Sequence, residues 1–341
     1  MHKISAKHLP NLFARIAGEM ELYLPVQQDN VVNYAPWQPS AHVDLDTLKT
    51  VTSPKQLFLP SSEELYSATS AGGEISISLP PHQNSPFAIF GVKACDAKGI
   101  EILDSVYLSQ PVDKFYESRR SSATIITLAC NKPNMTCFCK AFGIDASTPT
   151  GDVATWITET TLYWQAQTKK GESLTASLSD ILETTNDETT EIKENIHIKI
   201  DALPYSNLVL DELNHENLMQ VFNSPQWEEL YHTCIACGTC TYLCPTCQCY
   251  DISSFDTGQC VKFHRCWDSC MFSDFTQMAH GNPRPSHKER FRQRFMHKLV
   301  YHPQAYGGTY GCVGCGRCIN KCPVNMSIVK VVNAFNYTNK G

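Results

Sequence analysis

One arrangement of cysteines occurs twice in the last third of the chain and constrains its fold more than any other feature. The first copy is Cys234-Ile-Ala-Cys-Gly-Thr-Cys-Thr-Tyr-Leu-Cys-Pro245, and the second copy runs from Cys312 to Pro323. Both follow the spacing C-x₂-C-x₂-C-x₃-C-P, in which thiolates hold [4Fe–4S] clusters. Three closely spaced cysteines of one copy bind one cluster, and the cysteine before proline binds the cluster of the other copy.

This crossed pattern predicts the ligands of two clusters. Cluster 1 takes Cys234, Cys237, Cys240 and Cys322. Cluster 2 takes Cys312, Cys315, Cys318 and Cys244. Gly238 and Gly316 lie where each loop must bend tightly around an inorganic cube, which a residue without Cβ permits. Zinc sites use two C-x₂-C pairs instead of this run, and disulfides need an oxidising compartment that nothing in the sequence indicates.

The overall composition narrows the remaining classes of function. A chain of 341 residues allows two or three domains. Its formal charge of −6 gives no electrostatic reason for binding nucleic acid or a membrane surface. The N-terminal residues show no secretory leader, and no apolar run approaches a membrane span of about 20 residues. Seventeen cysteines in such a chain favour metal ligands over a disulfide framework, so we expect a cytoplasmic protein.

Hydrophobic patterning predicts the domain organisation. The apolar runs 87–92 and 123–129 are typical of buried strands, and the first leads into a helix predicted over 98–108 with Asp96 as N-cap. A polar helix start is predicted at 61–65. We therefore predict an α+β (α/β-like) N-terminal domain over residues 1–222. A mostly α-helical ferredoxin-type domain follows over residues 223–341, with a long insertion at about 247–305.

Four further cysteines fall in the predicted N-terminal domain: Cys95, Cys130, Cys137 and Cys139. Two predicted strands end at or just before members of this third set, and the ends of strands are where α/β folds place their chemistry. Four thiolates can hold a third [4Fe–4S] cluster or a zinc ion. The alternative is that they are unliganded buried thiols, which behave as small hydrophobic side chains.

The insertion carries more cysteines and a basic stretch. Cys247, Cys249 and Cys270 are candidate ligands of a further metal, or they shape the pocket around the two clusters; Cys260 and Cys266 are expected to be ordinary thiols. Lysine and arginine residues at 287–298 are typical of a solvated helix face. Alternatively, Arg290, Arg292 and Arg294 offset the negative charge of the thiolate-bound clusters.

Several segments together resemble the beta subunit of cytoplasmic sulfhydrogenases and related nickel–iron hydrogenases, which is similar to the 4Fe-4S dicluster electron-transfer subunit of anaerobic sulfite reductase. The segments are Gly91–Asp96, Tyr116–Arg120, Cys137–Cys139, Cys234–Cys249, Trp267–Phe272, Asn282–Arg284 and Cys312–Cys318. The C-P-T-C-x-C extension, the W-D-S-C segment and the G-V-x-x-C-D turn are the specific ones. In the last of these, Ala94 replaces the proline expected before Cys95, so this turn departs from the family's pattern.

The resemblance implies an electron-transfer subunit between an FAD-binding, NAD(P)H-oxidising reductase subunit and a terminal catalytic subunit. That catalytic subunit would be a hydrogenase, or a sulfite or sulfur reductase. The resemblance also implies that the third set of cysteines binds an additional cluster. No residue of this chain is predicted to be catalytic, and no G-x-G-x-x-G follows a strand to bind a flavin or nicotinamide.

Two other functions stay open. One is a self-contained iron–sulfur reductase with its own substrate site near Cys247–Cys270. The other is a zinc-stabilised binding module.

Overall fold

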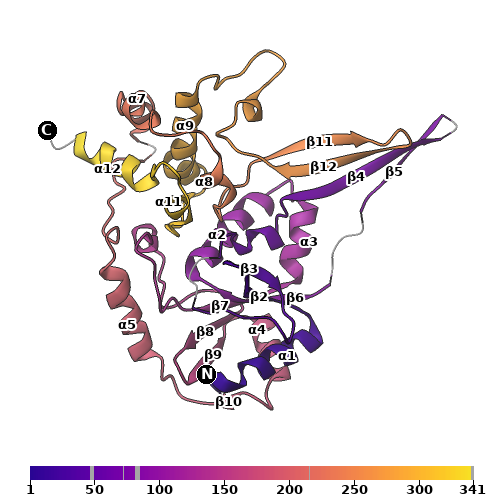
Figure 1. Cartoon of the computed structure of the whole chain (residues 1–341), viewed down its shortest axis with the longest axis vertical. Coiled ribbons are helices and arrows are strands. Elements are labelled where there is room, and N and C mark those ends of the chain that lie inside the picture. The colour runs from indigo at the N-terminus through magenta and orange to yellow at the C-terminus, as the bar shows by residue number, and fades with distance from the viewer. Residues whose placement is uncertain (47–49, 72, 81–84, 215, 339–341) are drawn as a thin grey trace.

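The computed structural model describes residues 1–46, 50–71, 73–80, 85–214 and 216–338. Its largest element is an eight-stranded sheet with the order β10-β1-β9-β8-β7-β6-β2-β3 (Figure 1). The strands are β1 (His2–Ser5), β2 (Glu21–Gln28), β3 (Val31–Pro36), β6 (Phe87–Val92), β7 (Ala123–Leu128), β8 (Val153–Ile157), β9 (Thr161–Ala166) and β10 (Glu183–Thr184). The central strands β2, β6, β7 and β8 run parallel to one another, whereas β3 pairs antiparallel with β2, β9 with β8 and β1, and β1 with β10.

Helices cover both faces of this sheet. Successive residues of β6 alternate between two hydrophobic clusters: Phe90 packs with Phe13 of α1, whereas Ile89 packs with Ile100 of α2. Helices α1 (Leu9–Glu19) and α4 (Lys169–Ser177) lie on one face, and α2 (Ala94–Tyr107), α3 (Lys114–Ser122) and α5 (Thr190–Asp201) lie on the other. Central strands covered on both faces are apolar throughout, which confirms the buried strands predicted at 87–92 and 123–129.

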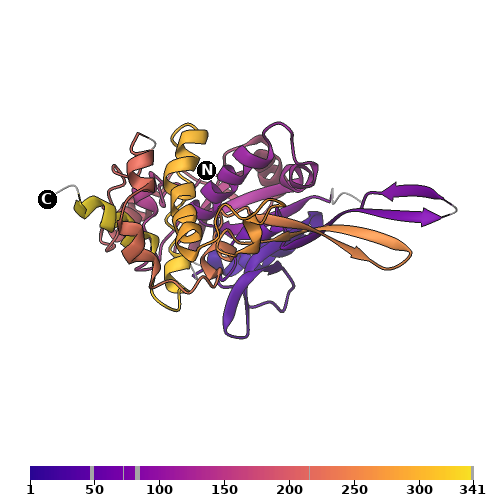
Figure 2. The same ribbon diagram turned by 90° about the horizontal axis from the view of Figure 1, so that it is seen from above.

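A second, four-stranded antiparallel sheet has the order β11-β12-β4-β5. Its strands are β4 (Ser62–Ala71), β5 (Glu74–Ser78), β11 (Tyr250–Asp256) and β12 (Cys260–Trp267). Two of them come from the predicted N-terminal domain and two from the insertion between the cysteine runs, so this sheet joins the two regions. Figures 1 and 2 show it extending away from the rest of the molecule as a narrow arm.

Two local predictions are wrong. Residues 61–65 do not begin a helix but lead into β4, because the carboxylate of Glu63 is buried against the distant side chains Arg119 and Arg265. Asp96 is not the N-cap of α2. Lys93 occupies that position, and Asp96 lies in the first turn with its carboxylate turned to Arg317.

The C-terminal region consists of short helices, long loops and the β11–β12 ribbon, and is therefore less helical than predicted. Its helices are α6 (Leu218–Phe222), α7 (Gln226–Tyr231), α8 (Thr239–Tyr242), α9 (His287–Met296), α10 (His302–Ala305), α11 (Arg317–Asn320) and α12 (Ile328–Thr338). A π-helical turn, His297–Tyr301, continues α9 directly into α10. Trp227, Phe291, Phe295 and Val332 form the core that α7, α9 and α12 share. A capping box between Ser286 and Glu289 fixes the start of α9.

Three-residue and four-residue 3₁₀ turns complete the described elements. They are η1 (Ala6–His8), η2 (Pro54–Leu57), η3 (Cys139–Phe142) and η4 (Asp274–Thr276). Of these, η3 begins at a cysteine of the third set and so positions part of the candidate site.

Candidate iron–sulfur sites

The structure brings together the four cysteines predicted for cluster 1. Cys234, Cys237, Cys240 and Cys322 all line one cavity. The first three surround the start of α8, where Gly238 adopts a left-handed φ of 73°, and the fourth follows α11. Apolar side chains complete the walls, among them Phe291 and Phe295 of α9. A cavity with thiols on several sides and apolar walls suits a thiolate-bound cluster.

The cysteines predicted for cluster 2 are also neighbours. Cys244 interacts electrostatically with each of Cys312, Cys315 and Cys318. Burial raises the pKa of the Cys312 thiol, and that of Cys318 to about 12. A fully buried thiol becomes a thiolate only with a compensating positive charge, which a bound cluster's iron supplies. The short helices α8 and α11 contact each other, which brings the two cysteine runs together.

Backbone amides point at the sulfur atoms in both runs. The N–H of Ala236 donates to Cys234 Sγ at 3.4 Å, and the N–H of Gly314 donates to Cys312 Sγ at 3.5 Å. The N–H of Met326 donates to Cys322 Sγ at 3.2 Å. Such N–H···S bonds stabilise thiolate charge and raise the potential of a bound cluster.

The third set of cysteines also converges. Cys95 begins α2 and Cys130 follows β7, while Cys137 and Cys139 come from the loop that leads into η3. Cys130, Cys137 and Cys139 share one buried hydrophobic cluster, against which Cys95 packs. Burial raises the pKa of Cys139 to about 12, and its thiol interacts electrostatically with Cys137 and Cys130. Among the described residues, no group of three His, Cys, Asp or Glu side chains is placed to hold a single metal ion.

The third set lies directly against the second cysteine run. The N–H of Phe138 donates to the carbonyl of Gly314 at 2.8 Å. A Cβ on Gly316 would lie 2.2 Å from the carbonyl oxygen of Thr136, so only glycine fits there. The Cys137 thiol also lies 4.0 Å from the carbonyl oxygen of Cys315. The predicted site of cluster 2 is therefore next to the third set in space, although the two are far apart in the sequence.

A buried ion pair fastens the same junction. Both nitrogens of the Arg317 fork donate to the Asp96 carboxylate, at 2.6 and 2.7 Å. Arg317 stands between two predicted ligands of cluster 2, and Asp96 follows Cys95 of the third set. Burial alone lowers the pKa of Arg317, but the charge of Asp96 raises it overall, so the guanidinium stays protonated.

Two cations face the thiols from α9 and its π-helical continuation. Arg294 and Lys298 are both buried, and neither makes an ion pair with a carboxylate in the described part of the chain. Lys298 Nζ donates to Cys244 Sγ at 3.3 Å, Thr246 Oγ1 at 2.8 Å and the Gly311 carbonyl at 2.9 Å. Burial lowers the pKa of Lys298, but the thiols of Cys244, Cys247 and Cys312 raise it above its usual value overall.

Of the three arginines considered from the sequence, the structure turns only Arg294 toward the thiols. Arg290 donates to backbone carbonyls, and Arg292 donates to the Phe222 carbonyl and lies over its ring. Lys298 was not identified from the sequence. Its spacing of four residues from Arg294 places both on one helix face, which is the signal that could have identified it.

Three cysteines of the insertion lie beside cluster 2. Cys247 hydrogen-bonds to Cys244, and Cys249 hydrogen-bonds to Cys270. The second bond lowers the pKa of Cys249 to about 7. Lys55 Nζ donates to the Cys247 carbonyl at 3.0 Å. The structure therefore groups these three candidate ligands, whereas Cys260 and Cys266 lie on β12 in the arm.

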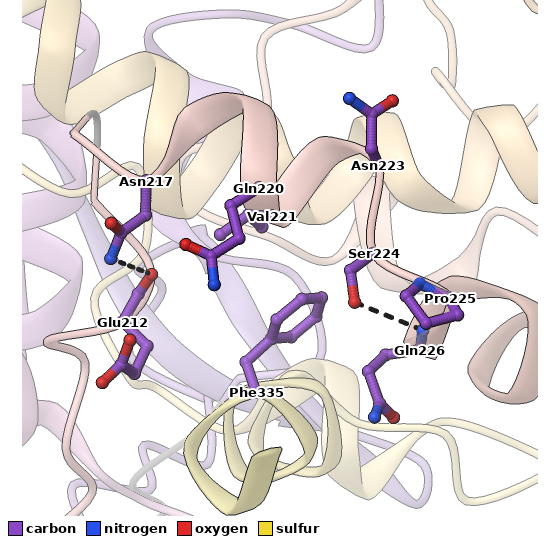
Figure 3. Close-up of a pocket in the computed structure, with 9 residues that line it drawn as sticks. All are labelled: Glu212, Asn217, Gln220, Val221, Asn223, Ser224, Pro225, Gln226 and Phe335. Atoms are coloured by element: carbon purple, nitrogen blue, oxygen red, sulfur yellow. Dashed lines mark hydrogen bonds between the residues drawn. The ribbon is translucent and has the colours of Figure 1, made fainter. Parts of the chain in front are cut away.

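A separate pocket lies between α6, the start of α7 and α12 (Figure 3). Phe335 of α12 lies at one side of the pocket. Four amide side chains line its rim: Asn217, Gln220, Asn223 and Gln226. None of the cysteines lines this pocket.

Comparisons with known proteins agree with this arrangement. A family model described as a 4Fe-4S dicluster domain matches residues 233–326, which include both cysteine runs. The chain is 30% identical to sulfhydrogenase 2 subunit beta of Pyrococcus furiosus, over 97% of its own length and 97% of that protein's. The search of solved structures gave no significant match. Among the described residues, no helix is long and apolar enough to span a membrane.

Proposed function

Because the chain belongs to the sulfhydrogenase beta-subunit family and contains a 4Fe-4S dicluster domain, we propose that it relays electrons within a multisubunit oxidoreductase. It accepts electrons from an FAD-binding, NAD(P)H-oxidising reductase subunit and passes them to a catalytic hydrogenase or sulfur-reducing subunit, or conducts them in reverse. We place this complex in the cytoplasm. The relative is named as a beta subunit, which supports an assembly with other subunits.

One observation carries the proposal: Cys322 lines the same cavity as the first three cysteines of the other run. This crossed pairing supports two neighbouring clusters with the ligands predicted from the sequence. The convergence of Cys95, Cys130, Cys137 and Cys139 supports a third cluster at the N-terminal domain. Zinc is the lesser alternative for that set.

The contacts support an arrangement of the three proposed sites in a row. Cluster 2 would lie in the middle. On one side its ligand loop touches the third set, and on the other side clusters 1 and 2 draw their ligands from the same two cysteine runs. Cys237, a predicted ligand of cluster 1, is exposed, whereas Cys130, Cys137 and Cys139 are buried. In this arrangement cluster 1 faces a partner subunit most directly.

Each [4Fe–4S] cluster supplies a one-electron redox centre when bound. The chain's own residues hold the sulfur ligands, donate N–H groups to them and place two buried cations, Arg294 and Lys298, beside them. Each of these features stabilises the more negative, reduced state of a cluster. No acid, base or nucleophile of the chain is needed for this role.

The test is iron counting on anoxically prepared protein. Three clusters predict about twelve iron atoms per chain, and serine at Cys322 or at Cys139 should each remove about four. Cys260→Ser is the matched control and should keep the wild-type count. The proposal fails if the wild type binds fewer than about eight iron atoms. If the wild type instead contains zinc that is lost only in Cys139→Ser, the third cluster is refuted and the other two clusters are not.

A self-contained reductase is the second candidate, favoured by the group of thiols at Cys247, Cys249 and Cys270. The purified chain alone should show reducible cluster signals by electron paramagnetic resonance but no turnover of sulfite, polysulfide or hydrogen with NAD(P)H. Turnover by the isolated chain would favour this second function over the relay.

A further inference from the structure

The arm formed by β4, β5, β11 and β12 has two chemically different faces. Side chains of a strand alternate between the faces of its sheet, and the register places Ile77, Ala68 and Val261 in one row across three strands. Tyr66 and Phe263 lie opposite each other in a neighbouring row of the same face, and their stacked rings are 4.4 Å apart. This face of the arm is therefore apolar.

The opposite face is mostly polar, with Phe255 as an exposed exception. The hydroxyl groups of Ser67 and Ser78 lie 2.8 Å apart on it, and Lys262 Nζ lies 3.1 Å from the Glu64 carboxylate. An antiparallel sheet with one apolar and one polar face normally packs the apolar face on a hydrophobic core. The arm therefore has the pattern of one layer of a two-layer structure.

The described part of the chain supplies no second layer for the outer part of the arm. Ile75 and Ile77 of β5 are 75% and 66% exposed, and Ile252 of β11 is also more than half exposed. From the usual spacings of strands and residues, this face measures about 15–20 Å in each direction, or about 300 Å². Exposed apolar patches of about this size are often interaction sites.

Buried charges fix the direction of the arm at its root. Arg265 of β12 donates to Glu63 of β4 and to Asp113, the N-cap of α3. Glu63 also accepts from Arg119 of α3, at 2.8 Å. Removing one partner of such a buried network leaves an unpaired charge, so the root stays attached to the N-terminal domain. The arm thus extends from the molecule in one set direction (Figures 1 and 2).

The composition of the apolar face favours a second copy of this chain as its partner. A two-fold axis places one patch against itself, so each residue must tolerate its own kind across the interface. Aliphatic and aromatic side chains meet this condition, whereas like charges repel. In the described outer part of the arm, the register places a single charged side chain, Asp256, on this face, at its edge. Interfaces between different proteins use complementary charges to fix their register, and the centre of this face has none.

We propose that the arm is a dimerisation element whose apolar face packs on the same face of a second copy of the chain. The two sheets stack about 10 Å apart, as the layers of a β-sandwich do. Ile75 and Ile77 then move from water into a shared core. The inference does not rest on the proposed function, because it needs the arm and not the clusters.

The first test is sedimentation of the full-length, anoxically prepared holoprotein over a range of micromolar concentrations. We expect a dimer that dissociates on dilution. Ile77→Lys puts a charge into the shared core and should raise the dissociation constant at least about tenfold. Ile198→Lys, on α5, is the matched control, because Ile198 is 67% exposed; this variant should behave as wild type. A wild type that is monomeric throughout, or equal dissociation constants for wild type and Ile77→Lys, would overturn the proposal.

The second test distinguishes a second copy from a different protein. A tagged chain is isolated, with the proteins that accompany it, from cells that also make an untagged wild-type chain of distinguishable mass. The tagged wild type should retain the untagged copy and tagged Ile77→Lys should lose it, with the other accompanying proteins unchanged. If Ile77→Lys instead keeps the untagged copy and loses a different protein, the face binds that protein and the proposal is overturned.

Iron is counted on the same samples, so the two proposals of function can fail separately. Equal iron in wild type and Ile77→Lys shows that the substitution leaves the cluster region folded. Too little iron in the wild type would count against the proposed electron relay, while the sedimentation result would still decide on the dimer.

Discussion

The two cysteine runs have the same spacing but very different surroundings. In the first run Cys237 is exposed, and its thiol lies 3.4 Å from the Thr239 hydroxyl of the same run. In the second run Cys315 is buried, and Arg317 at the matching position binds Asp96 of the N-terminal domain. One run therefore faces outward while the other is built into the interior.

This difference shows how a repeated motif acquires two roles. The cysteines and glycines of each run are set by the needs of a cluster, so they repeat. The residues between the cysteines and glycines depend instead on the segments that each run contacts in the folded protein. A small polar residue suits a loop that another subunit can approach, whereas a buried arginine holds the second loop against the third set of cysteines. Under the proposed relay, electrons would enter at one run and continue inward at the other.

Among the variants considered, Asp96→Asn should destabilise the second, inner cysteine run most. It removes the charge that compensates Arg317, and an unpaired buried charge costs about 3–5 kcal/mol. We expect a lower midpoint of thermal unfolding for the anoxic holoprotein. The signals of cluster 2 and the third cluster should be lost before that of cluster 1. An unchanged midpoint would show that the junction does not depend on this ion pair.

Alanine substitutions at the equivalent glycines, Gly316 and Gly238, should destabilise the two runs unequally, and by less than Asp96→Asn. Gly316 and Gly238 have nearly equal φ angles of 71° and 73°, so the backbone strain is common to both. A Cβ on Gly316 would lie 2.2 Å from a backbone oxygen of Thr136, whereas on Gly238 it would lie 2.7 Å from the Phe272 ring, which can turn. We expect Gly316→Ala to cost about 3 kcal/mol and Gly238→Ala about 1 kcal/mol. Equal unfolding midpoints in the two variants would contradict this account.

Lys298→Met should shift the potential of one cluster selectively. The ammonium group lies 3.3 Å from Cys244 Sγ, a predicted ligand of cluster 2. Losing a positive charge there disfavours the reduced state, so the potential of cluster 2 should fall by tens of millivolts. Redox titration followed by electron paramagnetic resonance measures this shift. The exposed Lys288→Met is the control, and equal shifts of both clusters in Lys298→Met would refute the assignment.

The convergence of the predicted ligands of the two clusters could be anticipated because their spacing is local in the sequence. Each run must wrap three sulfurs around one cube, which leaves a fixed pattern of cysteine, glycine and proline. The grouping of Cys95 with Cys130 followed from strands that end at the same edge of a sheet. The structure places these residues together as that reasoning expects, and their role as ligands stays a proposal.

Contacts between distant segments could not be predicted in the same way. The start of β4 carries the polar residues of a helix start, and only the long-range pairing of Glu63 with Arg119 and Arg265 explains its strand. Similarly, a lysine in a basic stretch suggests a solvated face. Burial against thiols distinguishes Lys298 from Lys288, and burial depends on the tertiary fold.

The smallest effect is expected for an ion pair beside the outer run. Lys288 Nζ lies 2.8 Å from the Glu228 carboxylate, close to the 2.6 Å between Arg317 and Asp96, but the side chains are 40% and 55% exposed instead of 3% and 1%. Because water and salt screen an exposed pair, Glu228→Gln should leave the unfolding midpoint unchanged within error at physiological ionic strength. Asp96→Asn removes the same charge from an equally short pair, so the two variants differ chiefly in burial. A loss of stability in Glu228→Gln as large as that in Asp96→Asn would mean that distance, and not burial, determines what each run contributes.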